Sequence, residues 1–189
     1  MTLYRTVEPA VEPVTLVEAK AQLRIAHDSE DALLEGLIRA ARSEVEAQAG
    51  IALTEQSWRL ALDEWPPSGI VRLRRHPVRE VLSVTVYGRE GEAAIVDPGD
   101  YEIDMASRPA RLRLLRRVDP GKCMNGIEID FAAGFGEAGA DVPDLLKRAI
   151  MFLVAHWYEF RGSFRAKDQP VSFPAGFDRM LAGYRAGRL

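Results

Sequence analysis

The chain has 189 residues, of which 47% are hydrophobic, and Cys123 is its single cysteine. This length and apolar content indicate one folded domain or two small ones and exclude a disordered chain. One cysteine excludes an internal disulfide and a thiolate metal cluster. No apolar run approaches the ~20 residues that span a bilayer, and the N-terminus lacks the apolar stretch of a secretory signal. We therefore expect a soluble, cytosolic chain without membrane contact.

Charge is spread unevenly along a chain that is nearly neutral overall. The 25 Lys and Arg residues oppose 28 Asp and Glu residues, which gives a net charge of −3. Counted by segment, residues 1–50 carry −4, residues 51–142 carry −3 and residues 143–189 carry +4. An acidic front and a basic tail favour head-to-tail contact between copies, or docking of the tail on an acidic partner.

The N-terminal part of the sequence predicts two helices after an extended arm, residues 1–14. Thr15 and Glu18 have the spacing of a capping box, which predicts a short helix over residues 16–23. An apolar stripe at three- and four-residue spacing then predicts an amphipathic helix over residues 29–49.

The C-terminal part predicts one long helix and one short helix. Pro143 suits a first helical turn, and strongly apolar residues continue to about Arg161. After a looser stretch, a last short helix is expected over residues 175–184. Because a single helix cannot bury its own apolar stripe, we expect helix 29–49 to pack against helix 143–161.

The middle of the chain predicts β structure. Over residues 52–133, short runs of β-branched and aromatic residues alternate with Gly, Pro and Asp turn signals at nearly even spacing. The expected fold class is therefore α+β: a helical bundle of the N- and C-terminal helices with an inserted antiparallel β-sandwich or barrel-like module. The expected segments are 1–50 for the arm and first helices, 51–142 for the β module, and 143–189 for the long helix and tail.

No catalytic or metal-binding constellation can be assembled from the sequence. His27, His76 and His156 lie in three separate elements, and no base lies near Cys123. The carboxylates of residues 97–104 could form a cation site or a hydrolase pair, but a solvated acidic rim is the better interpretation. We therefore predict that the chain is not an enzyme and has no catalytic residue, metal or cofactor.

Two clusters of arginines are the most unusual local feature. The period of two in residues 111–114, Arg-Leu-Arg-Leu, places both arginines on one face of a strand and both leucines on the other. Such a face can meet an acidic partner, stay in solvent, or bind nucleic acid; we favour the first two because the chain is acidic overall. Arg79 adjoins the first cluster, and the candidate interface or DNA-facing residues are Arg72, Arg74, Arg75, Arg108, Arg111, Arg113, Arg116 and Arg117.

Several segments, taken in order, resemble phage head–tail connector (adaptor) proteins. Residues 15–24 follow the family pattern T-L-x-E-A-K-x-x-L-R, and residues 37–46 follow L-I-x-A-A-R-x-x-V-E. Residues 142–150 and 156–161 match its later segments V-P-x-x-L-x-x-A-I and H-x-Y-E-x-R, and the ending over residues 173–185 is also similar. The resemblance frames the whole chain, whereas the β module is similar in outline.

The resemblance implies a structural role without catalysis or a cofactor. Proteins of this family assemble as a ring, commonly a dodecamer, beneath the portal of a long-tailed phage or gene transfer agent. The implied partners are the portal protein, a stopper or tail-side neck protein, and further copies of the chain. DNA would pass through the ring without sequence-specific binding. The implied location is the neck of a virion or phage-like particle assembled in the bacterial cytoplasm.

Within that role, the basic C-terminal tail is the expected contact with the portal. Buried aromatic residues and arginines dominate interface energies, which makes the tail's own residues candidates. The candidates are Phe173, Phe177, Arg179, Leu181, Tyr184, Arg185 and Arg188. The alternative for the four apolar residues of this set is that they pack on their own subunit. If they dock on the portal instead, a chain without residues 170–189 should still fold. The competing function is a DNA-binding or packaging accessory protein that acts through the arginine clusters.

Overall fold

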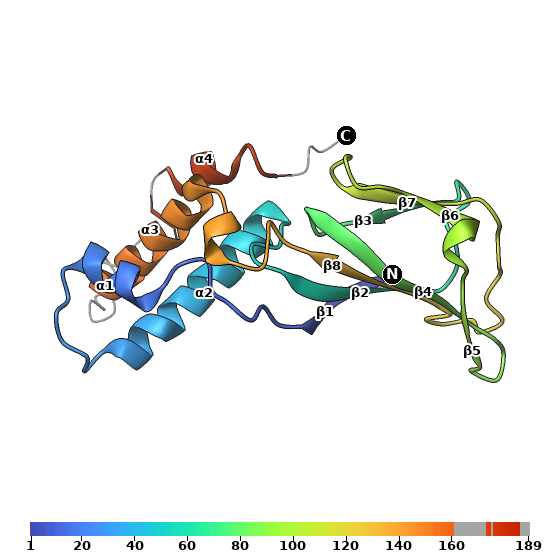
Figure 1. Cartoon of the computed structure of the whole chain (residues 1–189), viewed down its shortest axis with the longest axis horizontal. Helices are drawn as coiled ribbons and strands as arrows, with labels where there is room; N and C mark the ends of the chain where they lie inside the picture. Colours follow the sequence, from blue (N-terminus) through green and yellow to red (C-terminus); the bar gives the residue numbers. More distant parts are fainter. Residues whose placement is uncertain (161–172, 175, 186–189) are drawn as a thin grey trace, which may run out of the picture. The chain divides into compact units, whose positions relative to one another are not determined.

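The computed structural model describes residues 1–160, 173, 174 and 176–185. Antiparallel strands and α-helices both contribute to this structure (Figure 1), which confirms the α+β class. The elements in chain order are β1 (Thr2–Val7), α1 (Leu16–Leu23), α2 (Asp31–Ala49), β2 (Gln56–Leu62), β3 (Ile70–Leu73), β4 (Val78–Tyr87), β5 (Ala93–Ile95), a 3-10 turn (Pro98–Asp100), β6 (Tyr101–Asp104), β7 (Ala110–Leu114), β8 (Ile127–Ala133), a second 3-10 turn (Gly139–Asp141), α3 (Asp144–Phe160) and α4 (Phe177–Leu181).

The chain divides into two compact units. The β unit contains residues 1–10 and 55–134, and the helical unit contains residues 11–54 and the described residues from 135 onward. The boundaries of these compact units fall at residues 54 and 134, whereas the sequence pattern predicts segments that end at 50 and 142, and the N-terminal part is split after residue 10. The reason for this split is β1, which pairs in antiparallel fashion with β2 and so draws the N-terminal arm into the sheet.

The helical unit is built from segments at the two ends of the sequence. The helices α2 and α3 pack against each other, and α1 and α4 contribute to the same apolar core. Thr15 and Glu18 form the predicted capping box: the Glu18 amide donates to the Thr15 hydroxyl at 3.2 Å, and the Thr15 amide donates to the Glu18 carboxylate at 2.7 Å. Gly50 ends α2 in the left-handed conformation, with φ of +70°, where a glycine avoids the steric cost of a Cβ.

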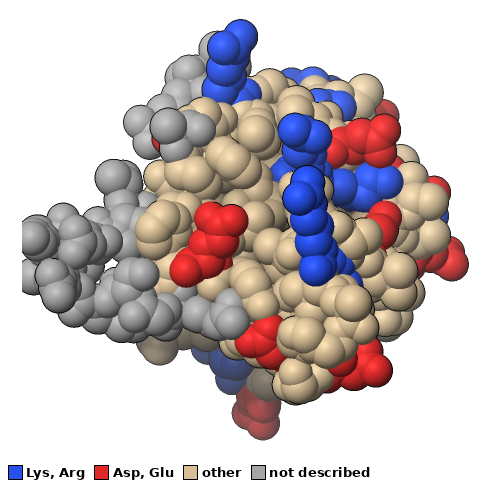
Figure 2. Space-filling view, turned by 90° about the vertical axis from the view of Figure 1, so that its left-hand side faces the viewer, with Lys and Arg blue, Asp and Glu red and all other residues tan. Residues whose placement is uncertain are grey.

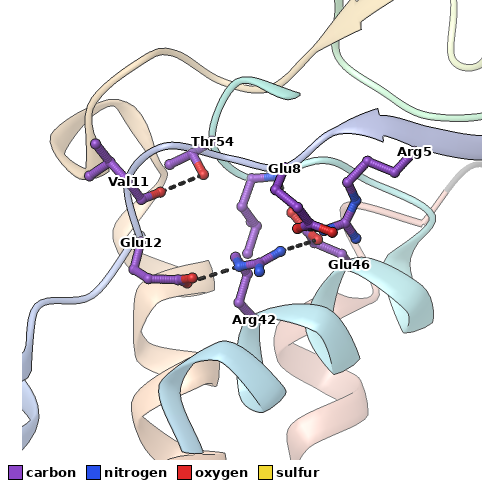
Figure 3. A network of polar contacts seen from close by, with 8 residues as sticks. Arg5, Glu8, Val11, Glu12, Arg42, Glu46 and Thr54 are labelled. Carbon is purple, nitrogen blue, oxygen red and sulfur yellow. Dashed lines mark hydrogen bonds and ion pairs between the residues drawn. The ribbon is translucent and has the colours of Figure 1, made fainter. Parts of the chain in front are cut away.

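A buried ionic network lies on the inner side of α2 (Figure 3). Arg42 is 4% exposed, and its Nε donates to the Glu12 carboxylate at 2.8 Å. Its Nη1 donates to Glu46, one helical turn further on, at 3.1 Å. Glu46 is 2% exposed, and its second oxygen accepts the Leu53 amide at 2.9 Å. The network thereby links the segment before α1, which contains Glu12, and the segment after α2, which contains Leu53, to α2 itself.

Hydrogen bonds join the segments by which the chain enters and leaves the helical unit. The Thr54 hydroxyl donates to the Val11 carbonyl at 2.9 Å, and both residues are drawn in Figure 3. The Phe135 amide donates to the Leu53 carbonyl at 2.9 Å, and Thr54 forms a parallel bridge with Gly136. Three segments far apart in sequence therefore lie side by side in this unit.

The β unit contains two antiparallel sheets. The five-stranded sheet has the order β1-β2-β8-β4-β5, and the three-stranded sheet has the order β3-β7-β6. The central strand β8 buries Ile127, Ile129 and Phe131 completely. On its other face, Asp130 receives two hydrogen bonds from Arg59 of β2, at 2.7 and 2.8 Å, and this carboxylate raises the pKa of Arg59.

Candidate functional site

The described residues offer no metal centre. No group of three or more His, Cys, Asp or Glu side chains among them is placed to hold a metal ion. In the same part of the chain, no helix has the length and hydrophobicity required to cross a bilayer. Of the histidines, His27 contacts the Ser29 hydroxyl and His156 packs against the ring of Phe160. Cys123 is exposed in the loop before β8.

The carboxylates of residues 97–104 have structural partners. Asp97 accepts the Gly99 amide at 2.8 Å and so caps the 3-10 turn. Asp104 accepts the Ser107 hydroxyl at 2.6 Å and the Arg111 Nε at 3.0 Å. The Ser107 hydroxyl, followed by Arg111, holds the pKa of Asp104 well below its usual range. A general acid needs a raised carboxyl pKa, so Asp104 is suited to a permanent charge instead.

Three of the predicted arginines meet on one face of the three-stranded sheet. Along β7, Arg111 and Arg113 are exposed and Leu112 is fully buried, which confirms the predicted alternation. The register pairs Arg111 with Arg72 of β3 on one side and with Asp104 of β6 on the other. Directly paired residues point to the same side of a sheet, so these charged side chains share the exposed face.

The remaining arginines of the two clusters divide into two groups. Arg75 lies over the Trp58 ring, 4.6 Å from its centroid, and Arg117 pairs with Asp119 at 2.5 Å. Arg79, which adjoins the first cluster, pairs with Glu55 at 3.0 Å. Arg74, Arg108 and Arg116 are exposed, and their guanidinium groups have no hydrogen-bond or ion-pair partner among the described residues.

The apolar residues of the C-terminal tail pack on their own subunit. Phe177 is 1% exposed, and Leu181 is completely buried in the core of the helical unit. Phe173 stacks on Phe177 with ring centroids 5.3 Å apart, and Tyr184 meets Phe135 edge to face at 6.3 Å. Phe177 and Leu181 therefore pack within their own subunit, as the alternative expects, because the apolar face of α4 covers the core of α2 and α3. A contact of the tail with the portal stays a prediction.

The charged residues of the tail are less engaged. Arg185 pairs with Asp178 at 2.6 Å and donates to the Gln48 carbonyl at 3.2 Å, whereas Arg179 is exposed. Arg188 lies outside the described residues. Among the predicted portal contacts that are described, Arg179 and Arg185 are thus both exposed, and Arg185 is engaged in an ion pair.

The structure also exposes apolar residues of α3 that the sequence pattern does not distinguish from core residues. Leu145, Phe152 and Phe160 of α3 are exposed, although they belong to the same apolar run as the buried residues of that helix. The seven-residue spacing of Leu145 and Phe152 places these two on one side of the helix, away from its buried residues. Phe160 follows the buried Leu153 by seven residues, so it lies on the core side and is exposed at the end of α3. Figure 2 shows a face of the helical unit, on which basic and acidic side chains are interspersed with uncharged surface.

Comparisons with known proteins give the resemblance a firm basis. A family model described as "Phage gp6-like head-tail connector protein" matches residues 13–93. The chain resembles the phage head–tail connector proteins. The similarity predicted from the sequence is thereby confirmed. Among curated proteins, none matches the sequence.

Solved structures extend this similarity to the whole chain. A chain of the "Neck of empty GTA particle computed with C6 symmetry" is 27% identical with a TM-score of 0.82, and one of the "Virion of native gene transfer agent (GTA) particle" is 27% identical with a TM-score of 0.81. A chain of the "Neck of native GTA particle computed with C12 symmetry" is 28% identical with a TM-score of 0.75. Each alignment covers 100% of this chain and 97% of the other. Relatives of the chain therefore lie in the neck of gene transfer agent particles.

Proposed function

We propose that the chain is a structural head–tail connector subunit of a tailed phage-like particle. In this role it forms a ring beneath the portal, extends the DNA channel, and docks a stopper or tail-side neck protein. The observation that carries the proposal is the match of the entire chain to a subunit of a gene transfer agent neck, with a TM-score of 0.82. The family model over residues 13–93 independently supports the same role.

A ring requires each subunit to present two different faces to its neighbours. The necks of the related particles were computed with sixfold and twelvefold symmetry, which supports a ring of many copies. The exposed apolar row on α3, formed by Leu145 and Phe152, supplies one face of suitable chemistry. For contact with the portal, Arg179 and Arg185 are exposed candidates of the tail, and Arg179 is the one without an ion pair among the described residues.

The connector role is tested in particles. The chain carrying a small tag is expressed in cells that produce its particles, and purified particles are imaged by electron microscopy with a label on the tag. We expect label at the neck, between the portal and the tail. Label along the tail, on the capsid faces, or absent from intact particles would contradict the connector role.

The contribution of the α3 face is tested with one matched pair of variants. Leu145→Ser removes an apolar side chain that is 45% exposed on α3, and Leu82→Ser removes one that is 51% exposed in the β unit. We expect Leu145→Ser to reduce incorporation into necks by several-fold and Leu82→Ser to leave it close to that of the unmodified chain. Equal incorporation of the two variants would exclude the α3 row as a ring contact.

A further inference from the structure

The exposed face of the three-stranded sheet contains an electrostatic conflict. Arg72 of β3 lies directly opposite Arg111 of β7, and like charges in this position destabilise a sheet. Asp104 of β6 neutralises Arg111 from the other side, with the Nε–carboxylate distance at 3.0 Å. The guanidinium of Arg72 is exposed and has no hydrogen-bond or ion-pair partner among the described residues. The conflict is thus relieved for Arg111 and not for Arg72.

The same face has a second arginine that is not engaged. Arg113 pairs in register with Ile70 on one side and with Glu102 on the other, but within the described chain no ion pair joins its guanidinium to a carboxylate. A groove runs over this face, and the Ile70 side chain contributes apolar surface to its lining. The face therefore combines two available guanidinium groups with the apolar side chain of Ile70 among charged residues.

Further arginines lie at both ends of this face. Leu73 pairs with Ala110, so Arg74 and Arg108, which lie just beyond these two positions, are at the same end of the sheet. Arg116 follows β7 at the other end, and its amide donates to the Asp100 carbonyl at 3.2 Å. The cations extend along the strand direction, which suits an extended ligand rather than a compact one.

We propose that this face, formed by Arg72, Arg113, Ile70 and Glu102, binds an extended acidic segment of another protein. Carboxylates on the segment would accept paired hydrogen bonds from Arg72 and Arg113, since the planar guanidinium matches carboxylate geometry. An apolar side chain two residues from a carboxylate of the segment would face the same side and cover Ile70. This interaction does not depend on the connector role.

A protein segment fits this face better than the DNA backbone does. Glu102 and Asp104 lie among the arginines and would repel a continuous row of phosphates. The Ser107 hydroxyl and Arg111 lower the pKa of Asp104, so this negative charge persists at every physiological pH. In addition, a phosphate backbone offers no apolar group for the isoleucine surface, whereas a peptide does.

The inference is tested on the full chain by fluorescence anisotropy with two labelled probes at physiological salt. The first probe is a short peptide with the repeat Glu-Ser-Val-Ser, which places Glu and Val on the same side of an extended chain, and the second is a short DNA duplex. We expect the peptide to bind and the double variant Arg72→Ser/Arg113→Ser to weaken that binding about tenfold, which is ~1.4 kcal/mol. We expect Glu102→Gln to strengthen peptide binding, because it removes a repulsive charge.

The control is the double variant Arg39→Ser/Arg89→Ser, which removes the same net charge at exposed positions elsewhere. Retention of peptide binding by this control supports the assignment of the face. Equal weakening by both double variants, tighter binding of the duplex than of the peptide, or failure of the peptide to bind would each overturn it. Thermal unfolding of Arg72→Ser/Arg113→Ser serves as the folding check, and removal of the opposed arginines should leave the melting temperature unchanged or higher.

Discussion

Replacement of Arg42 by Met should destabilise the helical unit strongly while preserving the length and apolar stem of the side chain. Arg42 and Glu46 are 4% and 2% exposed, and the substitution removes the guanidinium that faces the buried carboxylate at 3.1 Å. Loss of one partner from a buried ion pair costs about 3–5 kcal/mol. Glu12 is partly exposed, and Glu46 keeps its hydrogen bond from the Leu53 amide at 2.9 Å. We therefore expect a loss of stability at the lower end of this range, about 3 kcal/mol.

The measurement is urea unfolding followed by far-UV circular dichroism, since all α-helices of the described chain belong to the helical unit. For a chain of this length, ~3 kcal/mol corresponds to a fall of about 6–12 °C in the melting temperature. The control is Arg39→Met on the same helix, because the Arg39 side chain is 58% exposed and its ion pair with Glu35 is 3.9 Å long. That control should lose less than ~0.5 kcal/mol.

A double variant separates the charge from the packing. In Arg42→Met/Glu46→Gln the buried carboxylate is replaced by an amide, which still accepts the Leu53 amide. We expect this variant to recover more than half of the stability that Arg42→Met loses. The reasoning would be refuted if Arg42→Met were as stable as the unmodified chain, or if the double variant were less stable than Arg42→Met alone.

Three further predictions concern the helix cap, the tail and the sheet. Thr15→Ala should cost ~1 kcal/mol, and the pKa of Glu18, now lowered by the Thr15 amide and then by its hydroxyl, should rise in an NMR titration. A lowered Glu18 pKa stabilises the folded state at pH values above the ordinary Glu pKa, and this stabilisation is lost on acidification. The difference in stability between the parent chain and Thr15→Ala should therefore narrow as pH falls, and a constant difference would contradict the cap. Phe177→Ala should cost about 3–5 kcal/mol in urea unfolding, and a loss below ~1 kcal/mol would show that α4 is not part of the core. Arg59→Lys should cost ~1 kcal/mol, because a lysine cannot make both hydrogen bonds to Asp130; a thermal melt unchanged from that of the parent chain would exclude this.

Local chemistry made several elements predictable. The capping box of Thr15 and Glu18 depends on residues three positions apart, and the stop at Gly50 depends on one residue. The alternation of Arg111 and Leu112 follows from the two-residue period of any strand, so it also holds without knowledge of the partner strands. The family segments lie in helices, where the residues that define the pattern are close together in sequence.

Other features depend on contacts between distant residues. The arm at residues 1–14 gives no signal of its own, and β1 is a strand because β2 offers it a sheet edge. Likewise, the burial of Phe177 depends on the core that α2 and α3 form, so the tail sequence alone left docking and self-packing equally open.

The sequence by itself thus determined the helices, the β character of the middle and the resemblance to connector proteins, because these follow from periodicity, capping and short motifs. Only the tertiary structure decided which arginines of different strands share a face. Arg72 and Arg111 are 39 positions apart, and the register of β3 against β7 brings them opposite each other. A strand's own pattern fixes which side a residue faces, but the identity of its neighbour across the sheet depends on the pairing of the strands.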